Sequence, residues 1–389
     1  MNLTHSQLEE ILDSAMNSHG INKLFEIMLN SLMKIERKFF LEEQTDHKNK
    51  GNGFRYISGI GLNKSLRLAI PRDRLGYFYP LILELVRNQD EELAKLAYNL
   101  YGKGLSVRDV SDIFNDLYGN SYSKSTISRM NQDFIDEAEQ WRNRPLEKEY
   151  PILMIDALHS NVKRNNSIEM EASYIVMALR KDLTRDIIAI EHIPTESASG
   201  WEQLLLSLKK RGLEKVNLII ADGLTGLDQV IGKVFKNALF QKCVVHLKRN
   251  MLNRVRYTDR EKLAEDLSKV FVVGDPSYTK EQAIKNFNET MIKWGQYSSY
   301  FKNVLKNVNI INYLTYLEFD HRIHNMIYTT NWIESLNKQF RKTLKIRNSM
   351  PSEESILLLL TKVAIDKVNR YNNYAIYNFR FDKKLFEFN

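Results

Sequence analysis

Residues 150–256 constrain the fold most strongly, because nearly continuous apolar runs alternate there with amphipathic segments. The run PILMIDAL at 151–158 is typical of a strand buried on both faces. The later segments are, in chain order, strands at 171–182 and 184–193, a helix at 199–212, a strand at 217–223, a helix at 227–235, a strand at 238–246 and a helix at 247–256. Strands interleaved with helices in this way predict a mixed α/β sheet.

The rest of the chain shows mainly helical spacing of apolar residues. Residues 1–40 fit a helix, and the Gly- and Asn-containing stretch at 48–54 breaks its pattern. Within residues 63–74 a short stretch alternates apolar and polar residues like a strand, and Pro71 closes this alternation. Helix is predicted again at 77–104, at 257–319, where no strand pattern occurs, and from 329 to 371. The fold class expected is therefore multidomain α/β with helical parts.

Residues 106–134 are the part of the first half that most suggests a binding function. Ser106 and Asp109 resemble a capping box at the start of one helix, and a second helix starts at Ser123. Two short amphipathic helices fit a helix-turn-helix, and an ordinary helical hairpin fits them as well. In a helix-turn-helix, the outward residues of the second helix would read DNA. These residues are Lys124, Ser125, Ser128 and Arg129.

The 389 residues include 56 Lys plus Arg and 48 Asp plus Glu. There is one Cys, so an intramolecular disulfide is excluded and a reducing compartment fits. The N-terminus lacks a signal-peptide core, and apolar runs are too short to span a membrane. The basic excess is local: residues 231–260 hold eight basic residues against one acid, and 331–350 hold five against one. Such stretches are usually solvated helix faces, but they favour a polyanionic partner if chemistry falls in the same places.

Three carboxylates fall in positions suited to chemistry. Asp156 and Asp222 are predicted to end buried strands, where ligands of α/β sheets bind. Glu334 lies in the first turn of a helix that is otherwise basic. Each acid alone also fits a turn or a helix cap. Two neighbouring carboxylates would need a cation between them, and oxygen ligands suit Mg²⁺ or Mn²⁺.

The order and spacing of several motifs resemble the bacterial Mutator-type insertion-sequence transposases. The motifs are Asp156, Trp201 with Lys210-Arg211-Gly212, ADGLTGL at 221–227, QKCVVHLKRN at 241–250 and YTTNWIESLNKQFRK at 328–342. PRDR at 71–74 and the predicted helix-turn-helix also match in order, so the resemblance covers about residues 50–360.

This resemblance implies a DDE transposase with a ribonuclease-H-like core, which cuts DNA at terminal inverted repeats and joins the freed 3′ ends to a target. The implied catalytic and metal-binding triad is Asp156, Asp222 and Glu334. Two Mg²⁺ or Mn²⁺ ions would serve the phosphodiester chemistry. The implied division is a DNA-binding region at 1–149, the core at 150–256, an all-helical insertion at 257–320, and the rest of the core with C-terminal helices at 321–389.

The resemblance also implies supporting residues and partners. Active-site support is expected from Cys243, His246, Arg249, Asn250 and Asn331. Further DNA contacts are expected from Lys248, Arg254, Lys338, Arg341 and Lys342. The expected partner is double-stranded DNA, both inverted repeats and target, bound by a homodimer or higher multimer. The expected location is the bacterial cytoplasm, at the nucleoid during the reaction, with no membrane association.

Other interpretations stay open at this point. A catalytically inactive DNA-binding regulator would not need all three carboxylates, and a ribonuclease-H-like nuclease would not need a separate DNA-binding half. Cys243 and His246 have the spacing of half a zinc site, which His321 and His324 would complete. We favour the simpler hypothesis that Cys243 and His246 pack beside the active site and orient it.

Overall fold

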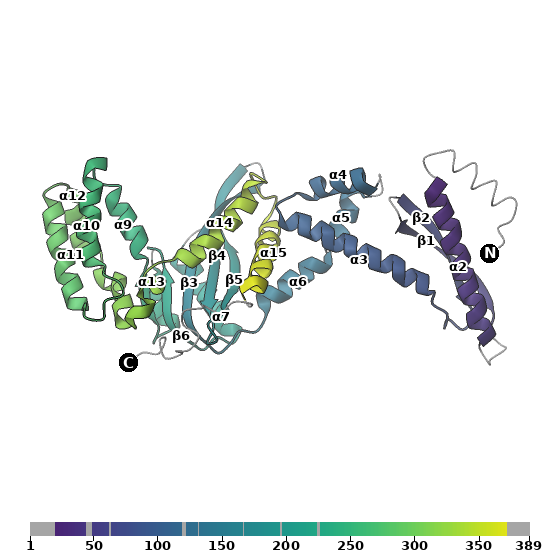
Figure 1. The fold of residues 1–389 in the computed structure, drawn as a ribbon, viewed down its shortest axis with the longest axis horizontal. Helices are drawn as coiled ribbons and strands as arrows, with labels where there is room; N and C mark the ends of the chain where they lie inside the picture. The colour runs from purple at the N-terminus through teal and green to yellow at the C-terminus, as the bar shows by residue number, and fades with distance from the viewer. Residues whose placement is uncertain are drawn as a thin grey trace. The chain divides into compact units, whose positions relative to one another are not determined.

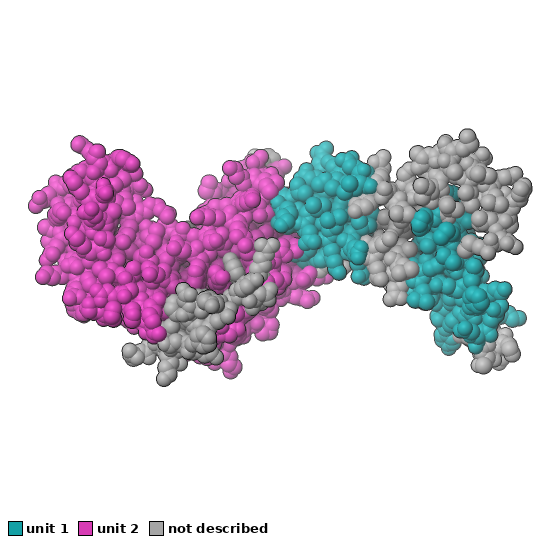
Figure 2. All heavy atoms as spheres, viewed as in Figure 1, with its two compact units in different colours: residues 1–135 teal, residues 136–389 magenta. Residues whose placement is uncertain are grey.

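The computed structural model describes residues 20–43, 49–61, 64–118, 122–130, 132–165, 167–194, 197–223 and 226–371. Its contacts divide the chain into two compact units, residues 1–135 and 136–389 (Figure 2). The first boundary predicted from the sequence, after residue 149, falls at the start of strand β3 (Glu149–Arg164). Within the described residues, no helix is long and apolar enough to cross a membrane.

The second unit is built on a five-stranded mixed sheet, as the sequence predicts (Figure 1). Its strands are β3, β4 (Ser167–Leu179), β5 (Arg185–Ile193), β6 (Lys215–Ala221) and β7 (Leu239–Lys242). The order across the sheet is β5-β4-β3-β6-β7. The first three strands form an antiparallel meander, and β6 and β7 run parallel to β3. The helical crossovers between β5, β6 and β7 explain the two parallel pairings.

Helices cover both faces of this sheet. Helices α7 (Ala198–Lys210) and α8 (Leu227–Val234) share a core with Leu153 and Ile155 of β3. At its centre the rings of Trp201 and Tyr174 stack with centroids 3.8 Å apart. Because strand side chains alternate between faces, Asp156 points away from this core. On its side, α14 (Asn331–Lys345) packs against β3 and α15 (Glu353–Tyr371) against β5.

Residues 257–320 contain α-helices and 3₁₀ turns and no strand among those described. Helix α9 (Val244–Leu252) leads from β7 to α10 (Arg260–Val270), α11 (Lys280–Gly295) and α12 (Ser299–Asn307). A capping box at Thr279 and Gln282 starts α11, and Phe287 and Phe301 are buried within the helices. Short turns follow at Ile310–Tyr313, Thr315–Glu318 and His321–Ile323, and then α13 (His324–Ile327) leads into α14.

The first unit contains a β-hairpin that the sequence prediction missed. Its elements are α2 (Gly20–Glu43), β1 (Gly51–Gly61), β2 (Lys64–Asp73), α3 (Leu81–Gly102), α4 (Val107–Tyr118), α5 (Lys124–Met130) and the start of α6 (Gln132–Asn143). The glycines at 51–53 begin β1 instead of only breaking a helix, and β2 continues through Pro71, which pairs with Phe54. A two-stranded sheet tolerates this proline because its outer edges need no partner. Of the helix predicted at residues 1–40, residues 20–40 fall within α2, and residues 1–19 lie outside the described part.

Helices α4 and α5 occupy the predicted helix-turn-helix region. The capping box is confirmed, because Ser106 N donates to Asp109 Oδ2 at 2.8 Å and Asp109 N donates to Ser106 Oγ at 3.2 Å. The buried rings of Phe114 and Tyr122 pack edge to face beneath α5. The second predicted helix, which starts at Ser123 in a region that ends at residue 134, is shorter in the structure. Helix α5 ends at Met130, and a separate helix begins at Gln132.

Candidate active site

Asp156 lies inside β3, so the prediction that it ends a strand was wrong. Strand β3 continues to Arg164 because β4 pairs with it from Ile152 to Arg164. The parallel pairing of β3 with β6, however, stops at Ile155 and Ala221. Asp156 and Asp222 therefore follow the last paired residues of two adjacent strands. The two carboxylates are brought together where β6 leaves the sheet.

The Asp156 carboxylate is held by a residue of α14. Asn337 Nδ2 donates a hydrogen bond of 2.6 Å to Asp156 Oδ2. Burial raises the pKa of Asp156 above its usual range, the hydrogen bond from Asn337 opposes this, and the charge of Asp222 raises the pKa further. Asn337 is completely buried, and the sequence analysis did not select it. The available signal was its position, one helical turn after Glu334 on the same face.

Glu334 reaches the same site from the first turn of α14. Thr330 Oγ1 donates to Glu334 Oε1 at 2.9 Å. His246 lies between two of the carboxylates, with Nδ1 3.4 Å from Asp222 Oδ1 and Nε2 3.8 Å from Glu334 Oε1. A hydrogen bond with the Cys243 thiol, together with the charges of Asp222 and Glu334, raises the pKa of His246 to about 9 despite its burial. A protonated His246 thus balances part of the negative charge.

Cys243 is buried at the start of α9, where its thiol shares a 3.3 Å hydrogen bond with Thr330 Oγ1. Burial raises the pKa of the thiol, but hydrogen bonds with His246 and Thr330 outweigh this and lower it. The strand predicted to run to His246 ends at Lys242, and Cys243 is the N-cap of α9. His246 therefore lies in the first helical turn. This turn is what directs its ring toward the carboxylates.

One group of possible metal ligands is found among the described residues: Cys243, His246 and Glu334, whose ligand atoms lie within 4.8 Å of one another. Among the described residues, neither the zinc set considered from the sequence nor the predicted triad Asp156, Asp222 and Glu334 meets this distance. The Nε2 atom of the buried His324 forms a 3.0 Å hydrogen bond with the carbonyl oxygen of Phe319. His321 lies beside Asp320, with its Nδ1 3.5 Å from Oδ1. These contacts support the simpler view of Cys243 and His246.

The structure separates the predicted DNA-contacting residues into two groups. Lys248 is half-buried, and its Nζ lies 5.4 Å from the centroid of the Phe271 ring, so it contributes to packing. The exposed group comprises Lys124, Ser125, Ser128, Arg129, Arg254, Lys338, Arg341 and Lys342. Three residues predicted to support the active site are exposed as well: Arg249, Asn250 and Asn331. Within the exposed DNA-contacting group, Arg341 is close enough to Asp156 for its charge to lower that pKa.

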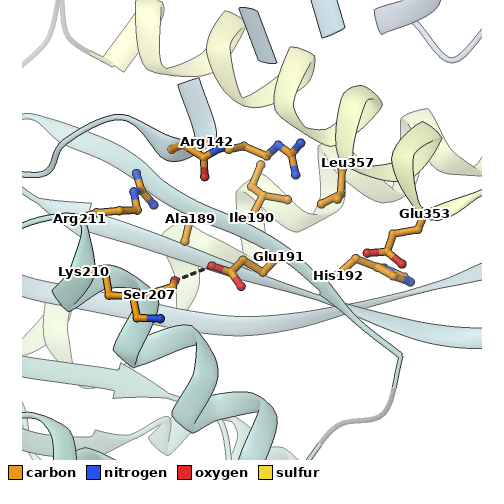
Figure 3. Close-up of a pocket in the computed structure, with 11 residues that line it drawn as sticks. Arg142, Ala189, Ile190, Glu191, His192, Ser207, Lys210, Arg211, Glu353 and Leu357 are labelled. Carbon is orange, nitrogen blue, oxygen red and sulfur yellow. Dashed lines mark hydrogen bonds between the residues drawn. The ribbon is translucent and has the colours of Figure 1, made fainter. Parts of the chain in front are cut away.

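A separate cavity of about 420 Å³ lies on the β5 side of the sheet (Figure 3). Arg142, Arg211 and Glu191 line it, and Ser207 donates a 2.5 Å hydrogen bond to Glu191. Glu353 and Lys210 also border it, so both signs of charge are present. None of the three predicted catalytic carboxylates lines this cavity. It is therefore distinct from the candidate active site.

Comparison with known proteins places these observations in context. The family model described as Transposase, Mutator family, matches residues 2–373. The chain is 28% identical over 358 residues to the transposase for insertion sequence element IS905 of Lactococcus lactis, covering 89% of this chain and 90% of that protein. It is 28% identical over 370 residues to the transposase for IS256 in transposon Tn4001 of Staphylococcus aureus, covering 94% of each. Among solved structures, the Drosophila P element transposase strand transfer complex matches 72% of this chain and 80% of that one, with 12% identity and a TM-score of 0.30.

Proposed function

Because the chain belongs to the Mutator family of transposases, we propose that it is the DDE transposase of an insertion sequence. In this proposal it binds the terminal inverted repeats and catalyses metal-dependent DNA cleavage and strand transfer. Asp156, Asp222 and Glu334 form the catalytic triad. The observation that carries the proposal is the meeting of Asp156 and Asp222 at the end of the β3–β6 pairing, under the helix that bears Glu334.

The arrangement of the sheet supports a ribonuclease-H-like core. An antiparallel meander of three strands is followed by two parallel strands, with the carboxylates on the central strand and its parallel neighbour. The third carboxylate comes from a helix beyond residues 257–320, which we assign as an all-helical insertion. A DNA-binding role for the helices α4 and α5 completes the proposed architecture.

The residues present fit divalent cations. Two oxygen-donor carboxylates lie together, and burial raises the pKa of one of them, so bound positive charge would stabilise the pair. Asp156, Asp222 and Glu334 would hold two Mg²⁺ or Mn²⁺ ions. Such ions, when bound, activate a nucleophilic oxygen and stabilise the leaving oxygen in an in-line displacement at phosphorus. A thiol is a poor ligand for these hard ions, so Cys243 is left to orient Thr330.

The protein's own residues then supply geometry and charge. Asn337 fixes the orientation of the Asp156 carboxylate, and Thr330 fixes that of Glu334. His246 lies between Asp222 and Glu334, where a proton on its ring would balance part of their negative charge. The exposed basic residues of α9 and α14 would bind DNA phosphates. We also propose that the protein acts as a homodimer or higher multimer on DNA, in the bacterial cytoplasm at the nucleoid.

The test is to replace each triad member in turn. Asp156→Asn, Asp222→Asn and Glu334→Gln should each abolish Mg²⁺-dependent cleavage and joining of a duplex that carries the element's inverted repeat. Binding of that duplex should persist in all three variants. Asp228→Asn is the matched control, because Asp228 is another acid that follows β6, on α8. Cleavage retained by any triad variant would refute the assignment of that residue.

The unmodified protein distinguishes the alternatives in the same assay. A DNA-binding regulator would bind the inverted repeat without cutting it. A nuclease would cut the duplex without joining its 3′ ends to a second DNA. Cleavage followed by joining is the result that the proposed transposase requires.

A further inference from the structure

A groove of about 410 Å³ lies along the part of β3 that follows Asp156. The groove is bordered by β3, by the start of β4 and by the C-terminal half of α14 with the turn that follows it. Its described lining residues are His159, Ser160, Asn161, Met170, Arg341, Leu344, Lys345, Asn348, Ser349 and Met350. We call it the β3 groove.

The β3 groove exists because β3 changes its neighbour. Beyond Ile155 the strand has lost β6, and its edge is next covered at Val162, which bridges to Met350. Lys163 N donates to the Met350 carbonyl at 2.8 Å, and Met350 N donates to the Asn161 carbonyl at 2.8 Å. The segment between Asp156 and Asn161 is therefore left open. The turn after α14 closes one end of the groove. No triad carboxylate lines it, but Arg341 of its lining follows Asn337, the hydrogen-bond partner of Asp156, by one helical turn.

The lining of the β3 groove is complementary to a phosphodiester backbone. Arg341 and Lys345 are exposed and lie one helical turn apart on α14. Ser160 Oγ is buried without a hydrogen-bond partner among the described residues, so it has a hydroxyl to donate. No acidic residue occurs among the described residues that line the groove. Cations and a free hydroxyl next to a nuclease-type triad favour a nucleic-acid strand over an apolar or cationic ligand.

An apolar rim borders the groove on the β3–β4 hairpin. Ile168 and Met170 are 63% and 72% exposed, so both apolar side chains are available for a contact outside the chain. Met170 lines the groove and Ile168 does not. Met170 pairs with Asn161, so these two apolar side chains share the face of Asn161, and Ser160 points to the other face of β3. Apolar side chains of this kind contact or separate stacked bases in DNA complexes.

We propose that the β3 groove holds the DNA strand on one side of the scissile phosphate. Arg341, Lys345 and Ser160 would bind its backbone, while Ile168 and Met170 would pack against its bases. This inference rests on the proposed function. At the ~3.3 Å rise of a strand, Ser160 lies roughly 13 Å along β3 from Asp156, so the contacted phosphates are expected within about four nucleotides of the cut.

The experiment measures binding of the inverted-repeat duplex by the full-length protein as a function of salt, together with KM and kcat of Mg²⁺-dependent cleavage. Lys345→Gln should weaken binding about 5- to 10-fold and reduce the slope of log affinity against log salt by about one, with kcat nearly unchanged. Lys236→Gln is the matched control, because this exposed lysine precedes β7, at the sheet edge opposite Asp222.

The apolar rim is tested with 2-aminopurine placed at single positions of the duplex. Wild-type protein should raise its fluorescence at a position within about four nucleotides of the cut, because a base that loses its stacking neighbours fluoresces more strongly. Met170→Ser should lose this rise, whereas Leu206→Ser, on α7 and 41% exposed, should keep it.

The outcomes separate this proposal from the proposed function. If wild-type protein neither cleaves nor joins the duplex, the proposed function fails. If wild-type protein is active while Lys345→Gln and Met170→Ser both behave like their controls, the function stands and the β3 groove proposal is overturned. An unchanged salt slope with Lys345→Gln would by itself refute the proposed contact between Lys345 and a DNA phosphate.

Discussion

The side chains at the candidate active site owe their positions to contacts that single residues make across elements. Asn337 and Asp156 are 181 residues apart in the sequence and share a 2.6 Å hydrogen bond. Thr330 contacts both Cys243 and Glu334. Such supporting residues tune and orient the groups that carry out chemistry. At this scale, the site is a connected set rather than three isolated acids.

Asn337→Ala should lower the rate of Mg²⁺-dependent cleavage about 10- to 100-fold, because the Asp156 carboxylate would lose the group that orients it. Affinity for the inverted-repeat duplex should stay near the wild-type value. Gln339→Ala, two residues further along α14, serves as the control and should cleave normally. A rate near that of wild type for Asn337→Ala would show that the hydrogen bond does not position Asp156.

Glu171 allows a prediction about stability and pH. Its carboxylate accepts hydrogen bonds of 2.7 and 2.8 Å from Arg164 and lies 2.6 Å from His192 Nε2. The hydrogen bonds from Arg164 lower the pKa of Glu171, burial raises it, and the hydrogen bond with His192 lowers it further. The two hydrogen-bond partners outweigh burial, so the pKa of Glu171 falls to about 2. A lowered pKa means that the stabilisation is present above the ordinary Glu value and is lost as the pH falls toward 2.

Glu171→Gln should therefore reduce the free energy of unfolding by about 2 kcal/mol at pH 7. The difference from wild type should shrink as the pH is lowered from about 4.5 toward 2. Urea denaturation followed by circular dichroism at several pH values measures this. Glu169→Gln, an exposed neighbour, should change little at any pH. A difference that is constant with pH would contradict the ionic origin of the effect.

Among the elements, α5 and β3 show how far local patterns reach. The apolar face of α5 is buried at Ile127, and its polar residues are exposed, as the sequence predicts. Strand β3 differs from its prediction because two neighbours of different length pair with it. A pattern of apolar residues indicates a strand, but the length of each neighbouring strand decides where one edge of that strand loses its hydrogen-bond partner.

Arg129→Ala and Lys124→Ala should weaken binding to the inverted repeat more than binding to random DNA, since α5 is proposed to read bases as well as phosphates. A loss of about 1 to 3 kcal/mol is expected for a side chain that contacts a base. Competition binding with the two DNAs measures the ratio. Lys95→Ala, an exposed lysine on α3, is the control. Equal losses on both DNAs would assign α5 contacts to phosphates alone.

For the whole molecule, the proposed DNA-reading helices and the triad belong to different compact units. Removal of divalent cations with a chelator should therefore abolish cleavage and joining while leaving most of the affinity for the inverted repeat. Adding Mg²⁺ or Mn²⁺ back should restore both reactions. Binding measured by anisotropy, in parallel with cleavage assays, checks this. A complete loss of binding on chelation would mean that metal also orders the DNA-binding surface.

The amino-acid sequence by itself determined the order of strands and helices in the second unit, the mixed sheet and the motifs of the Mutator family. These follow from periodicity and spacing, which are local properties. The hairpin β1–β2 escaped prediction because glycines, which usually break regular structure, start its first strand. The capping box at Ser106 was correct because capping depends on residues three apart.

Only the tertiary structure decided that Asp156 and Asp222 meet where β6 leaves the sheet, that Asn337 and Thr330 contact Asp156 and Glu334, and that an open groove follows Asp156. The physical reason is that each depends on pairing between distant segments. The register of β3 against β6 sets where the carboxylates meet, and the packing of α14 on β3 sets which of its residues reach them. Such pairings have no periodic trace in one chain, because they arise only when the segments are packed together.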